Sequence, residues 1–523
     1  PHTRHKGDDI PMNKLLKLIY SNKFFAITTL LMQVGIITAY VIGVSSNIRF
    51  YLLASNFISA ILIVCEVNRH EETAFKITWI MLIAIVPLFG WFFYLYTHTG
   101  IISRDIMRSH TIAQKKISEY RSEDTDTIKE MELAGCETSL VRYLSRSGGN
   151  CVYKNSDFKY YPIGEEMFVD MLYELRSAKD FIFMEFFIVS QKSYMWRAVE
   201  DILVEKAKNG VDVRVMYDGM GCIALMPKNY DKVLESKGIK CQVFAPVQPL
   251  LSTYQNNRDH RKVLVIDGRC AFSGGINLSD EYINKTVRFG HWKDTGFRLI
   301  GEAVKGFTEM FLTMWCTAAS TANVDFERFL NSSRAFPSLS AQGYIAPFCD
   351  SPLDNEPTGR NAYVDMLNTA KKYVHIMTPY FVVDEAIYNA MSYAVMRGVD
   401  VKVILPGIPD KRIPYCLARS YYEDLFNIGV EVYEYTPGFV HAKTTVSDDK
   451  RAIVGTINYD YRSLYLHYEC AVYAVDTPGI KDIEDDMLIT LSKCRRITPV
   501  EYKELPWYYR FLGRALRFIA TVI

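Results

Sequence analysis

A motif of one histidine, one lysine and one aspartate occurs twice in this chain with the same spacing, H-x-K-x4-D. The motif residues are His260, Lys262 and Asp267 in the first copy and His441, Lys443 and Asp448 in the second. The chain has only ten histidines. Chance alone would therefore give on the order of 0.03 matches to this pattern. Two copies indicate a repeated structural unit that carries shared chemistry.

The first motif lies on a stretch whose composition is typical of a buried β-strand. Val263 to Ile266 form an aliphatic, mostly β-branched run, which favours a strand covered on both faces. Side chains two residues apart on a strand point to the same face, so His260 and Lys262 are expected to lie side by side. This pair suits a tetrahedral phosphate, because lysine stabilises anionic oxygens while histidine attacks phosphorus or protonates a leaving oxygen.

The repetition extends beyond the two motifs. Three pairs of similar segments occur in the same order, and each series ends at an H-x-K motif: 164–172 with 359–367, 180–187 with 373–381, and 209–215 with 397–403. Helical and strand patterns alternate in both series, which predicts an α/β fold of two tandem halves with parallel-rich sheets covered by helices. We place the halves at 158–335 and 336–498, related by a pseudo-two-fold axis that brings both histidines into one cleft.

Apolar segments dominate the N-terminal part of the chain. After a basic segment, 1–23, we predict a membrane anchor at 24–97 made of N-terminal transmembrane helices. Its apolar runs are 24–44, 50–65 and 77–96. A spanning helix needs ~20 apolar residues, and the third run is interrupted by Pro87 and Gly90. Basic residues flank both ends of the anchor, and the positive-inside rule then requires an even number of crossings. Either the third run dips in and returns, or the second does not cross.

Two further segments complete the predicted organisation. A polar connector occupies 98–157, and an amphipathic segment occupies 499–523, where arginines alternate with aromatic and aliphatic residues. Two interpretations of the C-terminal segment stay open. It is either a helix lying in the plane of a membrane surface or an ordinary amphipathic helix packed on the domain.

The composition excludes several classes of protein. The net charge of +1 gives no global basic field of the kind that nucleic-acid binding requires. The eleven cysteines form no C-x-x-C or Cys/His cluster. We therefore expect no zinc site and no disulfide framework, and the pattern favours a reducing compartment. No metal and no cofactor is expected, since two lysines and two histidines can supply the charge stabilisation that phosphoryl transfer needs.

The two motifs and their surroundings resemble the phospholipase D superfamily. The strings HRKVLVIDGRCAFSGGINLSDEY and HAKTTVSDDKRAIVGTINYDYRS are similar to bacterial cardiolipin synthases in particular, and the resemblance runs from around Phe75 to the C-terminus. The sequence departs from the family pattern at Ser447, where an apolar residue is usual. The resemblance implies a phosphatidyltransferase that converts two phosphatidylglycerol molecules into cardiolipin and glycerol through a phosphohistidine intermediate.

The resemblance also assigns roles to the motif histidines and lysines. His260 is expected to attack phosphorus, and His441 to protonate the departing glycerol oxygen and then deprotonate the incoming alcohol. The near symmetry of the halves leaves the order of the two histidines open. Lys262 and Lys443 are expected to hold the non-bridging oxygens of the phosphate.

Six further residues complete the predicted site. They are the motif aspartates Asp267 and Asp448, the asparagines Asn277 and Asn458, and the acids Asp294 and Glu469. The aspartates are expected to position the site through hydrogen bonds, and the asparagines to donate amide hydrogens to the bound phosphate. For both pairs, a turn-forming role is the alternative. The two acids are expected to bind near the substrate and to orient a motif histidine through its second ring nitrogen.

Rival functions stay open at this stage. A phospholipase D-type hydrolase would pass the same intermediate to water, and another phosphatidyltransferase would use a different donor lipid. Intact motifs disfavour a non-catalytic scaffold, and the near-neutral charge disfavours a nuclease. We expect phosphatidylglycerol and cardiolipin in the bilayer as partners and no nucleic acid. The expected location is the bacterial cell membrane, multi-pass, with cytoplasmic catalytic halves; the oligomeric state stays undetermined.

Overall fold

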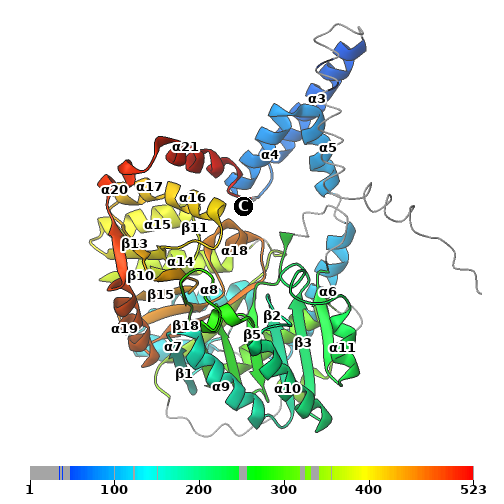
Figure 1. Cartoon of the computed structure of the whole chain (residues 1–523), viewed down its shortest axis with the longest axis vertical. Helices are drawn as coiled ribbons and strands as arrows, with labels where there is room; N and C mark the ends of the chain where they lie inside the picture. The colour runs from blue at the N-terminus through cyan, green and yellow to red at the C-terminus, as the bar shows by residue number, and fades with distance from the viewer. Residues whose placement is uncertain are drawn as a thin grey trace, which may run out of the picture. The chain divides into compact units, whose positions relative to one another are not determined.

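The structure is a computed structural model of the chain (Figure 1). It describes residues 35, 38, 47–98, 101–121, 124–149, 151–246, 256–318, 324–330, 341–354 and 356–521. The chain divides into two compact units. The first comprises 1–104 with 247–256, and the second comprises 105–246 with 257–523. Both predicted α/β halves lie in the second unit.

The described part of the first unit is helical. Its helices are α3 (Asn47–Val67), α4 (Thr73–Ile85) and α5 (Pro87–His98). The predicted run 50–65 lies inside α3, whereas the run 77–96 is divided between two shorter helices. The break falls at Val86, because a residue before proline is disfavoured in the helical conformation.

The predicted transmembrane helices find no support in this unit. None of the helices in the described ranges is both long enough and apolar enough to cross a membrane. The predicted run 24–44 lies outside the described residues, apart from Gly35 and Thr38.

The predicted connector at 98–157 is mostly helical. Its helices are α6 (Ile101–Ser118), α7 (Thr125–Leu133) and α8 (Ser139–Gly148). On α6, His110 Nδ1 lies 3.1 Å from the hydroxyl of Thr317. On α7 and α8, Met131 and Leu140 are fully buried in the core of the second half. The segment therefore packs on both halves.

The first half is built on a seven-stranded sheet in the order β1-β8-β6-β5-β2-β3-β4. Its strands are β1 (Ser156–Tyr161), β2 (Phe181–Phe186), β3 (Asp212–Asp218), β4 (Lys240–Phe244), β5 (Lys262–Ile266), β6 (Cys270–Gly274) and β8 (Gly296–Gly301). Its helices are α9 (Gly164–Ser177), α10 (Tyr194–Lys208), α11 (Tyr230–Ser236), α12 (Val304–Ala318), α13 (Phe326–Leu330) and the 3-10 helix η2 (Asp280–Ile283). The first motif begins directly before β5, at the centre of the sheet.

The second half repeats this arrangement on an eight-stranded sheet, β19-β13-β12-β10-β15-β16-β18-β9. Its strands are β9 (Tyr344–Asp350), β10 (Tyr373–Met377), β12 (Asp400–Pro406), β13 (Glu431–Tyr435), β15 (Thr444–Ser447), β16 (Arg451–Gly455), β18 (Glu469–Val475) and β19 (Cys494–Ile497). Its helices are α14 (Thr358–Thr369), α15 (Glu385–Met396), α16 (Arg412–Ser420), α17 (Tyr422–Asn427), α18 (Tyr461–Tyr465) and α19 (Gly479–Leu491). A separate pair joins β11 (Phe381–Val382) to β17 (Tyr459–Asp460). Apart from β19, the order of strands matches the first half, so the prediction of two equivalent α/β halves is confirmed.

The prediction of parallel-rich sheets is wrong. In the first sheet β2 pairs with β3 and β3 with β4 in parallel, while the other four pairings are antiparallel. The motif strand β5 turns straight back into β6 through Asp267 and Gly268, which have φ angles of 53° and 60°. So short a turn can join only antiparallel strands. The sequence pattern gave the alternation of helices and strands but not the direction of the strands after each motif.

Two short backbone pairings join the halves beside the motifs. β14 (Gly438–Val440) pairs in parallel with β7 (His291–Lys293), and an isolated bridge lies just before the first motif. The backbone N–H of His441 donates to the carbonyl of Lys293 at 2.7 Å, and that of His260 donates to the carbonyl of Tyr468 at 3.0 Å. In each case the next residue after the acceptor is one of the two predicted acids. Each histidine is thus held beside an acid of the opposite half.

The C-terminal segment is helical. Its elements are α20 (Pro499–Glu504), α21 (Trp507–Leu516) and the 3-10 helix η3 (Arg517–Ile519). Helix α20 begins with a capping box formed by Thr498 and Glu501. Helix α21 packs against α16 of the second half.

Candidate active site

The two H-x-K pairs occupy matching buried positions. His260 and His441 are each 7% exposed, and Lys262 and Lys443 are each 1% exposed. Each lysine donates a hydrogen bond to the backbone carbonyl of the histidine two residues before it. An ammonium group is therefore fixed next to each imidazole, without freedom to swing into solvent.

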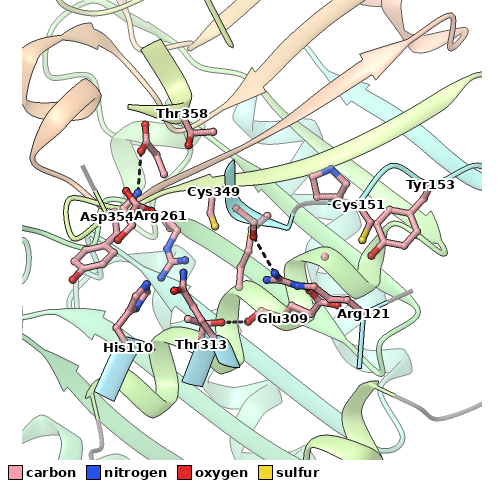
Figure 2. A pocket seen from close by; sticks show the side chains of 18 residues that line it. His110, Arg121, Cys151, Tyr153, Arg261, Glu309, Thr313, Cys349, Asp354 and Thr358 are labelled. Atoms are coloured by element: carbon pink, nitrogen blue, oxygen red, sulfur yellow. Dashed lines mark hydrogen bonds and ion pairs between the residues drawn. The ribbon is translucent and has the colours of Figure 1, made fainter. Parts of the chain in front are cut away.

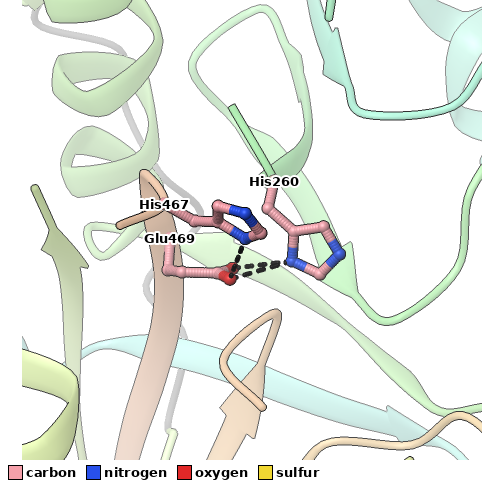
Figure 3. A group of neighbouring side chains, drawn as sticks. All are labelled: His260, His467 and Glu469. Carbon is pink, nitrogen blue, oxygen red and sulfur yellow. Dashed lines mark hydrogen bonds and ion pairs between the residues drawn. The ribbon is translucent and has the colours of Figure 1, made fainter. Parts of the chain in front are cut away.

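The carboxylates that contact the histidines come from opposite halves. His260 Nδ1 lies 2.9 and 3.0 Å from the two carboxylate oxygens of Glu469, at the start of β18 (Figure 3). His441 Nδ1 lies 2.7 Å from Asp294, which follows β7. Both acids are fully buried. Because each Nδ1 faces a carboxylate, the Nε2 atom of each ring is left for reaction.

A glycine makes room for one of these pairs. A Cβ atom at Gly275 would lie 2.0 Å from the Oδ1 of Asp294 and 2.9 Å from the carbonyl of His441. Any side chain at this position would push the carboxylate and the histidine apart. This gives a physical reason for the second glycine of the Gly274-Gly275 pair.

Glu469 has further polar neighbours that the sequence reasoning missed. The hydroxyl of Ser463 donates to Oε1 at 2.7 Å, and that of Thr456 donates to Oε2. The Nδ1 atom of His467 lies 3.7 Å from Oε1 (Figure 3). Its ring centroid is 5.5 Å from that of His260. The sequence signal that could have pointed to His467 is its position two residues before Glu469, in the string His-Tyr-Glu.

These neighbours also form a possible set of metal ligands. Ligand atoms of His260, His467 and Glu469 all lie within 4.8 Å of one another. The carboxylate in this set is the same one that holds Nδ1 of the motif histidine. An ion bound there would compete with that contact, so the geometry suits proton chemistry at His260 better than metal binding.

Burial controls the protonation of the four motif side chains. It lowers the pKa of His260 to about 3 and that of His441 to about 4. It also lowers the pKa of Lys262 to about 8 and that of Lys443 to about 7. At neutral pH both imidazoles are therefore neutral, and a lone pair on Nε2 is available for nucleophilic attack.

For Glu469, the acid that contacts His260, neighbouring groups outweigh the effect of burial on the pKa. Burial on its own raises the pKa of a carboxyl group, but the imidazole of His260 and the neighbouring His467 bring that of Glu469 well below its usual range. Glu469 therefore stays ionised. An ionised carboxylate fixes the tautomer of His260 with the proton on Nδ1.

Both histidines line one cavity of about 620 Å³. Its aromatic walls include Phe187, Tyr282, Phe289, Trp292, Tyr380 and Tyr461. Its basic residues are Arg258, Arg288, Lys411 and Arg462, and its acidic residues are Glu281, Asp410 and Asp460. An apolar wall with a few cationic groups suits an amphiphile that has an anionic head group.

The two predicted asparagines also line this cavity, with different surroundings. Asn277 accepts from the N–H of Ile188 at 3.0 Å and donates to the hydroxyl of Tyr282 at 2.8 Å. The Oδ1 atom of Asn458 is buried and has no hydrogen-bond partner among the described residues. Asn277 is thus engaged by the protein, whereas Asn458 has an acceptor that a ligand hydroxyl could satisfy.

The motif aspartates lie at the far ends of the motif strands, away from the histidines. The carboxylate of Asp267 accepts three backbone N–H groups, from Lys179, Asp180 and Phe181, at 2.8 to 2.9 Å. Asp448 accepts the three equivalent N–H groups of 371–373 at 2.8 to 3.0 Å. Each aspartate therefore ties the motif strand to the segment that enters the neighbouring strand.

A smaller cavity of about 30 Å³ lies behind the first motif (Figure 2). Arg261 and Tyr468, the sequence neighbours of His260 and Glu469, contribute to its walls. Arg121 donates to Glu309 at 2.9 Å on one side of this cavity. The volume admits about one or two water molecules, so this space suits ordered water rather than a substrate.

Comparison with known proteins agrees with this geometry. The model of the family described as "Cardiolipin synthase, PLD-like domain" matches residues 171–315 and 363–488. A protein named cardiolipin synthase from Alkalihalophilus pseudofirmus is 32% identical, over 98% of this chain and 100% of that protein. An uncharacterized protein of Streptococcus mutans serotype c is 44% identical, over 87% of this chain and 98% of that protein.

A solved structure shares the fold. The crystal structure of phosphatidylserine synthase from Haemophilus influenzae matches with a TM-score of 0.52 and 15% identity. The match covers 70% of this chain and 95% of that one. On the family match and the full-length relatives together, this chain belongs to the phospholipase D-like family of the cardiolipin synthases.

Proposed function

We propose that this protein is a cardiolipin synthase that transfers a phosphatidyl group from one phosphatidylglycerol molecule to another. One observation carries the proposal. Two imidazoles, each beside a buried lysine and each backed by a carboxylate of the opposite half, line a single cavity with aromatic and basic walls. Relatives named cardiolipin synthase along nearly the whole chain support the same reaction.

In the first step, His260 Nε2 attacks the phosphorus of the first phosphatidylglycerol. The N–P bond forms as the bond from phosphorus to the head-group glycerol breaks, and His441 gives its Nε2 proton to the departing glycerol oxygen. Lys262 and Lys443 stabilise the charge that builds on the non-bridging oxygens. The anionic phosphate favours the protonated form of His441, which the empty site disfavours.

In the second step, the head-group hydroxyl of another phosphatidylglycerol replaces glycerol. His441 takes the hydroxyl proton as the oxygen bonds to phosphorus and the N–P bond to His260 breaks. The products are cardiolipin and a regenerated pair of histidines. The exposed cationic side chains Arg288 and Lys411 in the cavity wall are suited to holding the phosphates of both lipids.

Hydrolysis is the competing outcome, because water can attack the same intermediate. The aromatic walls around the histidines favour lipid over water in the site; Trp292 and Phe187 lie 5.3 and 5.0 Å from the rings of His441 and His260. Water is excluded from the intermediate when the bound lipids pack closely against these aromatic walls.

We also propose that the protein works at the bacterial cell membrane. Both substrates are held in the bilayer, so an anchored enzyme reaches them by lateral diffusion. The apolar residues of 24–97 are the proposed anchor, with 98–157 as connector and the halves at 158–335 and 336–498 as the catalytic part. The large exposed apolar side chains of α3, including Phe50 and Leu53 at 71% and 68%, support an apolar environment there.

Lipid mass spectrometry on the purified full-length protein given phosphatidylglycerol tests the reaction. We expect cardiolipin and glycerol in equal amounts, and loss of both in His260→Ala and His441→Ala. A matched control is His375→Gln, which alters another buried histidine, paired with Glu484 at 3.0 Å, away from the cavity. Phosphatidic acid in place of cardiolipin would make the protein a hydrolase and contradict the proposal.

A donor with a good leaving group assigns the two histidines. p-Nitrophenol needs no proton to depart, so phosphatidyl-p-nitrophenol should still release it in His441→Ala but not in His260→Ala. The reverse pattern would exchange the two roles.

A further inference from the structure

Helix α21 turns its apolar side to the outside of the protein. Trp507, Tyr508, Phe511 and Leu512 are 72%, 60%, 66% and 51% exposed. The first and third of these residues are four apart, as are the second and fourth, so the two adjacent pairs share one face of the helix. Phe518 and Ile519 continue this face at 40% and 39%. We refer to these six residues as the α21 face.

The polar side of the same helix is the side that docks on the second half. Arg514 pairs with Glu423, and Arg517 pairs with Asp424 at 2.7 Å. Arg517 also donates to Ser420 of α16. An amphipathic helix on a water-soluble domain has the opposite orientation, with its apolar stripe inward.

Close backbone packing fixes this orientation. Gly513 is buried, and a Cβ atom there would lie 2.9 Å from the carbonyl of Cys416 and 3.0 Å from the Cβ of Ser420 on α16. The helix can approach α16 this closely only through its glycine. The bulky aromatic side chains therefore remain on the outside.

The α21 face is continuous with the mouth of the large cavity. Ala520, directly after the face, lines the cavity, as do Pro414 and Leu417 of α16. Also on α16, Ile413 is 56% exposed. Lys411 is both exposed and part of the cavity wall. An apolar surface with adjacent cationic groups thus leads from the outside into the site.

We propose that the α21 face docks on the surface of an anionic lipid bilayer and presents the cavity mouth to it. Tryptophan and tyrosine are enriched where proteins meet the interface of a membrane. Lys411, 67% exposed and part of the cavity wall, is placed to meet anionic head groups. Lipid substrate would then move from the bilayer into the cavity along the apolar surface. This inference rests on the proposed function, since it concerns how that site receives its substrate.

The double variant Phe511→Ser with Leu512→Ser tests the docking. The full-length protein is incorporated into vesicles of phosphatidylglycerol and phosphatidylcholine, and cardiolipin formation is measured. A second measurement uses phosphatidylcholine vesicles with water-soluble dihexanoyl-phosphatidylglycerol. Leu488→Ser with Ile489→Ser on α19 is the matched control, since those neighbours are 51% and 55% exposed and do not line the cavity.

We expect about a tenfold loss of activity on bilayer phosphatidylglycerol and no loss on the soluble donor. The control should keep both activities. Equal activity on the bilayer donor, or an equal loss on both donors, would overturn the inference. So would a change in oligomeric state, which would make the α21 face an interface between two copies of the chain.

Docking can also be measured without turnover. Brominated lipids quench tryptophan at the interface, so wild type should lose more fluorescence than Trp507→Phe in the same vesicles. If the wild type makes no cardiolipin from either donor but Trp507 is quenched, the proposed function fails and the docking stands. If turnover is normal and Trp507 is not quenched, the docking fails alone.

Discussion

The motif aspartate Asp267 should act on stability rather than on chemistry, and its contacts give the size of the effect. It lies seven residues beyond His260 along a strand, about 20 Å away. Its carboxylate binds three N–H groups, of which that of Phe181 belongs to a fully buried residue. Losing a charged acceptor there costs about 2 kcal/mol, and the two more exposed N–H groups, of Lys179 and Asp180, cost about 0.5 kcal/mol each because water replaces the carboxylate.

Backbone conformation adds a second contribution. Asp267 has a φ of 53°, where a residue with a Cβ other than Asn or Asp costs about 1 kcal/mol. Asp267→Ala should therefore destabilise the protein by about 4 kcal/mol and Asp267→Gly by about 3 kcal/mol. Asp267→Asn keeps one acceptor oxygen and the left-handed conformation, so it should cost about 1 kcal/mol.

Thermal unfolding followed by differential scanning fluorimetry measures these differences. Asp267→Ala should lower the unfolding midpoint by about 10 °C. The midpoints of the Gly and Asn variants should lie between those of Asp267→Ala and the wild type. Transferase activity at low temperature, per folded molecule, should change by less than about tenfold, because no reacting atom is touched. An Asp267→Ala protein with an unchanged midpoint and about a thousandfold lower activity would refute this reasoning and give the carboxylate a chemical role.

Three further predictions concern the buried charges. Glu469→Gln and Asp294→Asn should each lower kcat by about a thousandfold in steady-state assays, because the amide no longer fixes the reactive tautomer; an effect on KM alone would contradict this. The lowered pKa values of Lys262 and Lys443 mean that their ammonium charge, complete at low pH, is lost as pH rises through about 7 to 8, so rates between pH 6 and 9 should fall on the alkaline side. His467→Gln removes the second imidazole beside Glu469 and should change the pH profile of kcat while leaving KM within about twofold; a flat difference across pH would assign His467 a packing role.

Local patterns in the sequence carried much of the fold. The aliphatic run 263–266 is the central strand β5, and the repeated segments fall on matching helices and strands of the two halves. The pattern missed the elements directly before each motif, because their short apolar runs lack a clear period. These elements are α11 and β4 in the first half and α16, α17 and β13 in the second. Strand direction was also missed, since it depends on the tight turn at Asp267 and not on hydrophobicity.

Long-range pairing explains what the sequence could not give for the site. The acids Asp294 and Glu469 can be picked out from the sequence by their matching places after each motif. The sequence also predicts that each acid contacts a motif imidazole. Which imidazole each acid contacts depends on the pairing of β7 with β14 and on the bridge before His260. The resulting contacts join Asp294 to His441 across 147 positions of the chain and Glu469 to His260 across 209 positions. No periodicity within one half encodes a pairing between halves.

The crossed contacts make the two histidine–carboxylate pairs nearly equivalent, yet the reaction needs one neutral and one protonated imidazole. The difference lies in the donors that each carboxylate already has. Glu469 accepts hydroxyl hydrogen bonds from Ser463 and Thr456, which weaken it as a base and favour a neutral His260. Asp294 accepts a backbone N–H at 2.8 Å and, more weakly, the indole N–H of Trp292 at 3.5 Å, but no hydroxyl among the described residues, which favours the proton at His441.

Ser463→Ala should therefore shift the balance in a defined direction. Without this donor the carboxylate of Glu469 attracts a proton at His260 more strongly, so the folded-state pKa of that imidazole rises. The neutral nucleophile is then lost at a higher pH as the solution is acidified. Release of p-nitrophenol from phosphatidyl-p-nitrophenol, measured from about pH 2 to 7 to include the His260 pKa of about 3, should show its acid limb at higher pH in Ser463→Ala. In Ser463→Thr, which keeps the hydroxyl, the limb should stay at the wild-type position. An acid limb that moves in neither variant would mean that the hydroxyl does not tune His260, and the asymmetry of the site would have to come from the lysines.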